Sequence, residues 1–73
     1  MIDILIKNET GIIPVALAIS EDQIDSEDLT VINLDPVKLI LVGYDYIVGL
    51  DDGSNMIGRT CVSVRGTTAT FAK

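Results

Sequence analysis

Histidine and tryptophan are absent from this 73-residue sequence, and it contains a single cysteine, Cys61. Without histidine, neither a Ser-His nor a Cys-His nucleophile pair can be built, and the usual ligands of zinc and haem are missing. One cysteine also excludes an internal disulfide. We therefore expect no enzymatic activity, no metal site and no cofactor.

Basic residues are scarce, with five Lys and Arg against eleven Asp and Glu and a formal net charge of −6. This sign is wrong for a surface that attracts phosphate backbones, so we expect no direct DNA binding. A hydrophobic content of 48% argues against disorder. No apolar run approaches the roughly 18 residues of a membrane span, and Met1-Ile2-Asp3 carries no basic leader. We expect a cytoplasmic protein, or a virion component if the source is viral.

The length predicts one domain over residues 1–73. A core of this size is marginal, and the sequence offers neither a disulfide nor recognisable metal ligands to support it. Association with other chains is the remaining source of stability.

Alternating residues predict a β-rich chain, beginning with a strand over residues 2–7 that places Ile2, Ile4 and Ile6 on one face. Further segments rich in β-branched and aromatic residues are expected to be strands: 29–34, 37–42, 44–50, 56–64 and 68–72. A helix after Asp35-Pro36 is the alternative for the residues from Val37 onward. The predicted fold is all-β or nearly so, a small antiparallel barrel or sandwich of six to seven short strands.

Residues 12–19 are apolar at every position and predict a second strand that is covered on both faces. Pro14 lacks a backbone N–H, which places its half of this strand at a sheet edge or a bulge. The inward residues are expected to be Ile13, Val15, Leu17 and Ile19. The second apolar face is the candidate oligomer interface, formed by Ile12, Pro14, Ala16 and Ala18.

Residues 20–28 are the one segment for which a helix is the first expectation. Ser20 with Gln23 forms the pattern of a capping box, and Ile19 with Ile24 that of a hydrophobic staple. Five of the eleven acids lie in this acidic segment, namely Glu21, Asp22, Asp25, Glu27 and Asp28. They keep an apolar protein soluble or form a contact surface for a basic partner, by imitating phosphates.

Two further features invite a chemical interpretation. Asp51-Asp52-Gly53-Ser54-Asn55 has oxygen ligands around a glycine, but it lacks the ligand spacing of a calcium loop and predicts a hairpin turn. Strand alternation places Cys61 with Arg59, Ser63 and Arg65, opposite Thr60, Val62 and Val64. We expect Cys61 to be a buried filler, and the two arginines of this face to be a candidate anion or RNA contact.

Residues 29–72 resemble the Sm-like small barrels, through Gly43-Tyr44-Asp45, Gly58, Val64-Arg65-Gly66 and a last strand from Thr68 to Ala72. The resemblance implies a ring of subunits that binds single-stranded RNA near Tyr44 and Arg65. Gly49 stands where that family has a base-contacting asparagine.

Three functions follow from these observations. The first is a non-enzymatic interaction or assembly module, expected to be a homo-oligomer, of the kind found among small accessory and structural proteins of bacteria and their viruses. The second is an acidic inhibitor that binds a nucleic-acid-handling protein. The third is an Sm-like ring that captures RNA or a small anion.

Overall fold

A computed structural model describes residues 1–8, 11–18, 20–34 and 40–73, and for residues 11–15 the description is of the backbone. The strands are β1 (Ile2–Asn8), β2 (Gly11–Ala18), β3 (Asp28–Ile32), β4 (Asp45–Leu50), β5 (Ile57–Arg65) and β6 (Thr68–Ala72). A short 3-10 helix, η1 (Glu21–Asp25), connects β2 to β3. The all-β fold predicted from the sequence is confirmed.

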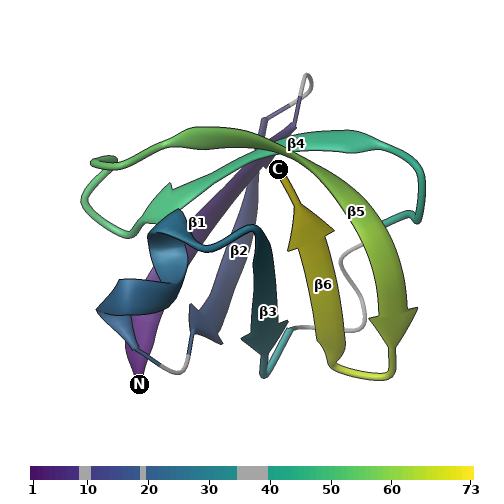
Figure 1. Ribbon diagram of the computed structural model, residues 1–73, viewed down its shortest axis with the longest axis horizontal. Helices are drawn as coiled ribbons and strands as arrows, with labels where there is room; N and C mark the ends of the chain where they lie inside the picture. The colour runs from purple at the N-terminus through teal and green to yellow at the C-terminus, as the bar shows by residue number, and fades with distance from the viewer. Residues whose placement is uncertain (9–10, 19, 35–39) are drawn as a thin grey trace.

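The six strands form a closed antiparallel barrel in the order β1-β2-β3-β6-β5-β4. Two three-stranded meanders, β1 to β3 and β4 to β6, are joined by the pairing of β3 with β6 and of β1 with β4 (Figure 1). Closure gives every strand two neighbours, which removes the exposed edges that favour aggregation. Within the described barrel, no strand therefore offers an edge for pairing with another chain.

The core fills the barrel with alternate residues of each strand. Ile4, Ile6, Val48 and Phe71 are among its fully buried members, and Ile2 packs against its margin. The ring of Tyr46 meets that of Phe71 edge-on, with centroids 5.7 Å apart. The alternation in residues 2–7 thus predicts β1 and its inward face correctly.

A register shift in the β1–β2 pair marks an extra residue in β2. Ile4 lies opposite Ala16, whereas Ile6 lies opposite Ile13, so the shift includes Pro14. A proline cannot complete the ladder of hydrogen bonds, and of the two positions predicted for Pro14, a sheet edge or a bulge, the structure has the bulge.

The face assignment of this strand was wrong for two members of the candidate oligomer interface. Ala16 and Ala18 are fully buried in the barrel core, and Leu17 is half-buried. The prediction assigned residues to alternate faces along the whole strand. Because the bulge adds one residue, this alternation assigns the residues beyond it to the wrong face. The side chains of Ile12 and Pro14 lie outside the description.

The segment after β2 is a single 3-10 turn. Ser20 is its N-cap but makes no side-chain capping bond, so the predicted capping box does not form. Ile24 is buried on the barrel, which orients the turn. Residue 19, needed for the predicted hydrophobic staple, lies outside the described residues.

Residues 40–42, the described part of the strand expected over 37–42, belong to no strand. Residues 35–39, and with them the start of the alternative helix, lie outside the description. Ile40 is buried, and the chain then turns through Gly43, whose φ of +89° suits glycine.

Candidate functional site

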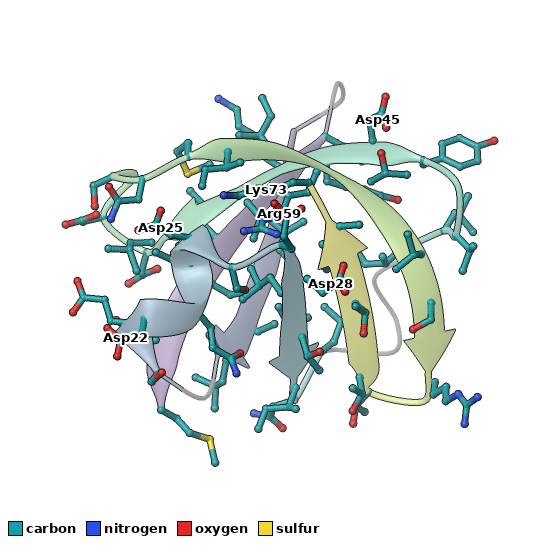
Figure 2. All side chains as sticks on the ribbon, in the orientation of Figure 1. Asp22, Asp25, Asp28, Asp45, Arg59 and Lys73 are labelled. Carbon is teal, nitrogen blue, oxygen red and sulfur yellow. The ribbon has the colours of Figure 1, made fainter. Side chains whose placement is uncertain are left out.

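Arg59 is the most unusual residue of the described structure, since it is charged and only 2% exposed. Its guanidinium group lies between η1 and the strands and donates hydrogen bonds to four backbone carbonyls (Figure 2). Nη2 donates to Ile24 and Ser26 at 2.8 Å each. Nη1 donates to Glu27 at 3.1 Å and to Phe71 at 3.2 Å. The side chain therefore fastens the acidic segment to the barrel.

Lys73 adds a second fastening beside the first (Figure 2). Its Nζ donates to the carbonyl of Asp25 at 2.8 Å, and its backbone N–H donates to the carbonyl of Glu27 at 3.0 Å. Both partners are backbone groups, so the carboxylates of the segment stay in water. All five are exposed: Glu21, Asp22, Asp25, Glu27 and Asp28.

Burial lowers the pKa of the Arg59 guanidinium below its ordinary value, while the nearby charges of Asp25, Asp28 and Glu27 raise it in opposition. A group with so high a starting pKa stays protonated at neutral pH. The arginine balances three of the acids electrostatically, although its hydrogen bonds go to carbonyls.

An apolar patch occupies a different part of the surface. Its members are Leu41, Val42, Tyr44 and Val62, which are between 41% and 61% exposed. The first three belong to the turn before β4, and hydrogen bonds join this turn to β5 beside Val62. Gly43 N–H donates to the Cys61 carbonyl at 2.8 Å, and Cys61 N–H donates to the Tyr44 carbonyl at 3.0 Å.

Two inward residues fix the conformation of this turn. Ile40 inserts into the core, and the hydroxyl of Tyr46 accepts a hydrogen bond from the N–H of Leu41 at 3.0 Å. The patch is thus presented by a turn that is held at several points.

The predicted anion face of β5 does not assemble. A second register shift, between Cys61 and Ser63, marks an extra residue in β5. Beyond this residue, Val64 packs against the core and Arg65 is exposed. Arg59 and Cys61 point inward before the bulge. Placing Arg59, Ser63 and Arg65 on one open face was therefore wrong, and the guanidinium of Arg59 is committed to carbonyls.

Cys61 is fully buried, and burial raises the pKa of its thiol. A protonated, inaccessible thiol is a poor nucleophile. The predicted burial of Cys61 is confirmed, and its low reactivity stays a prediction.

Residues 51–55 form the predicted turn. Oδ1 of Asp52 accepts hydrogen bonds from the N–H of Ser54 at 2.9 Å and from its hydroxyl at 2.6 Å. These bonds lower the pKa of Asp52. Across the described ranges, no three potential ligand side chains are grouped to hold a metal ion.

Two pockets of opposite charge lie on the barrel. One, of about 480 Å³, includes Lys7, Arg59 and Lys73 in its lining. The other, of about 370 Å³, includes Asp3, Glu21, Asp51 and Asp52. Sequence reasoning missed Lys7 and Lys73, since they lie near opposite ends of the chain and meet only after closure of the barrel.

Comparisons with protein-family models, with curated proteins and with solved structures find no match for this chain. The Sm-like resemblance therefore receives no support from them. Among the residues that the structure describes, no helix has the length and hydropathy to cross a membrane.

Proposed function

We propose that this chain is a non-enzymatic protein-binding module that assembles with further copies of itself through the apolar patch. The supporting observation is the contiguity of Leu41, Val42, Tyr44 and Val62 on a chain with a net charge of −6. Single exposed apolar side chains are ordinary on protein surfaces, but contiguous groups mark contact sites.

The patch has the physical properties of a binding surface. Tyrosine contributes a large contact area with few rotatable bonds, which keeps the entropic cost of binding low. The bonds from Gly43 and Cys61, together with the hydroxyl of Tyr46, hold the turn before any partner arrives. Preorganisation of this kind lowers the cost of association.

A second copy of the chain is the partner that the size of the domain favours. A barrel of 73 residues has a marginal core, which burial of the patch in a symmetric contact stabilises. Because the barrel is closed, the contact must use side chains and cannot extend the sheet by an added strand.

The test is the molar mass in solution, measured by size exclusion with light scattering over a range of protein concentrations. We expect a mass above that of one chain, 7.8 kDa, which falls on dilution. Val62→Lys introduces a charge into the patch and shifts the mass to 7.8 kDa. Ile47→Lys is the matched control, since Ile47 also lies in a strand and its exposed fraction, 46%, is close to the 48% of Val62.

Two results contradict the proposal. One is a wild-type mass of 7.8 kDa at all concentrations. The other is an equal effect of the two lysine substitutions, which would assign the association to general charge and not to the patch.

A second candidate function is binding of a basic protein surface by the acidic segment. Arg59 and Lys73 favour it, because their hydrogen bonds hold the backbone that carries the five exposed carboxylates. A preorganised acidic surface of this kind suits an inhibitor of a nucleic-acid-handling protein.

This candidate is tested on a partner isolated from the native host. Asp22, Asp25 and Asp28 are changed together to Asn, and we expect weaker binding with a smaller dependence on salt. Changing Asp3, Asp51 and Asp52 to Asn removes equal charge elsewhere and serves as the control. If both triple variants bind alike, the acidic segment is a solubilising surface only.

A further inference from the structure

The larger of these two pockets is lined by residues of β1, β4 and β5 and by Lys73. We propose that it binds a small organic anion, a molecule with one phosphate or carboxylate group and an apolar body. The site is independent of the apolar patch and of self-association.

Positive charge is concentrated in this pocket. Three of the five Lys and Arg residues of the chain line it: Lys7 from β1, Arg59 from β5, and Lys73. Lys7 and Lys73 are exposed, and the ammonium group of Lys73, which donates one hydrogen bond to the Asp25 carbonyl, has two further N–H donors for a ligand. Arg59 is 2% exposed, and its Nε has no hydrogen-bond partner in the described structure, so it contributes buried charge.

The floor of the pocket suits an apolar body. Ile47 lies opposite Lys7 on one side and opposite Gly58 on the other. Its side chain is 46% exposed. A Cβ added at Gly58 would meet nothing within 4 Å, so the missing side chain leaves open space beside the isoleucine.

One carboxylate, that of Asp45, lines the pocket against three basic side chains. Its Oδ1 accepts a hydrogen bond from the hydroxyl of Thr60 at 2.7 Å. The lining is therefore net positive within a chain of net charge −6. Ammonium groups form charge-assisted hydrogen bonds with phosphate and carboxylate oxygens, which makes an anionic group the matching ligand chemistry.

The size of the ligand follows from the charge of the whole chain. Fields are screened over about 8 Å at physiological ionic strength, so a small anion senses mainly the local lysines. A long polyanion would also meet the acidic segment, which Lys73 joins to the margin of this pocket. We therefore expect a small ligand and not RNA.

The experiment follows backbone amide shifts of the ¹⁵N-labelled protein by NMR at physiological ionic strength. The probes are adenosine monophosphate, phenylacetate, inorganic phosphate and a short oligouridylate. We expect saturable shifts at Lys7, Ile47, Gly58 and Thr60 with adenosine monophosphate or phenylacetate, and weaker binding of inorganic phosphate, which has no apolar body. The stronger of the first two identifies the group as phosphate or carboxylate.

Three variants locate the site. Gly58→Val fills the floor without a clash at Cβ, and Lys7→Gln removes one accessible charge. Lys7→Gln is expected to weaken the better probe by about tenfold, the loss typical of one charge-assisted contact, and Gly58→Val to weaken it by occupying the space of the apolar body. Arg65→Gln removes one charge from an exposed residue outside the pocket and should leave the affinity within about twofold of wild type.

The proposal is overturned by the absence of saturable shifts with both organic probes. It is equally overturned if Arg65→Gln weakens binding as much as Lys7→Gln, which would show unspecific attraction. Tighter binding of the oligouridylate than of either organic probe would replace the small anion by RNA. Since Lys7 is exposed, its variant remains informative even if Gly58→Val fails to fold.

Discussion

Replacement of Arg59 by methionine tests the role of the buried guanidinium. Methionine retains an unbranched side chain of similar reach but donates no hydrogen bond. Four carbonyls lose a donor, two of them in buried bonds, at Ile24 and Phe71. The bonds to Ser26 and Glu27 are only partly buried, so water can replace the donor there.

The expected loss of stability is about 3 kcal/mol. A buried group that loses its partner costs about 1 to 3 kcal/mol, and two such groups give roughly 2 to 6. Removal of a desolvated charge returns part of this cost. A chain of this length has a free energy of unfolding of roughly 4 to 11 kcal/mol, from about 0.05 to 0.15 per residue. The substitution therefore removes a large fraction of the stability.

Urea unfolding gives the free energy, and amide hydrogen exchange shows where protection is lost. We expect the N–H groups of Gln23 and Ser26, which close the 3-10 turn, to exchange faster than those of the strands. Arg59→Lys keeps the charge but loses the planar fork, and should cost about half as much. Arg65→Gln, at an exposed position, should change stability by no more than about 0.5 kcal/mol.

An Arg59→Met variant within about 1 kcal/mol of wild type would refute the fastening role. If that variant does not fold, Arg59→Lys decides the question by the same measurement. A lysine variant as stable as wild type would show that charge alone, and not the four-fold hydrogen bonding, holds the acidic segment.

Three other predictions concern single residues. Cys61 should react with a thiol reagent far more slowly in the native than in the urea-unfolded protein, because it is buried and its thiol pKa is raised; rapid stoichiometric labelling would contradict this. Gly49→Ala should destabilise the protein by about 1 to 3 kcal/mol, because the added Cβ would meet Met56 and lie 2.8 Å from the Ser54 carbonyl oxygen. Gly58→Ala should be neutral or stabilising, because its Cβ meets nothing within 4 Å. Equal unfolding midpoints of the two variants would contradict this difference. The pKa of Asp52, measured by NMR titration, should lie below its ordinary value of 3.8 because of its bonds to Ser54. These bonds support the turn above that pH and are lost as the pH falls through the lowered pKa. An unshifted pKa, or the same pKa in Ser54→Ala, would contradict the assignment.

Local pattern was sufficient to predict much of the fold. Ile2, Ile4 and Ile6 alternate without interruption, and β1 follows them. The last strand was predicted with its observed bounds, Thr68–Ala72, because the turn at Gly66 precedes it clearly. The proline of β2 correctly indicated a bulge.

The faces of strands and the contacts of charged residues needed the tertiary structure. A bulge exchanges inward and outward positions, and no residue type marks the one in β5 between Cys61 and Ser63. Arg59 binds carbonyls on a segment more than 30 residues earlier in the chain, and any residue type supplies a carbonyl. The acidic segment was therefore recognised, while the residue that fastens it was assigned to the surface.

The bulge in β5 has a consequence for the evolution of this chain. Insertion or deletion of one residue is normally tolerated in turns, where the flanking strands keep their faces. Deletion of the extra residue in β5 would also keep the faces of the strand, because it removes the bulge and leaves Val64 directed toward the core and Arg65 toward water. A homologue that is one residue shorter between Cys61 and Arg65 should therefore keep the polarity of the following positions, so that an alignment gap inside this strand marks the bulge and not a turn.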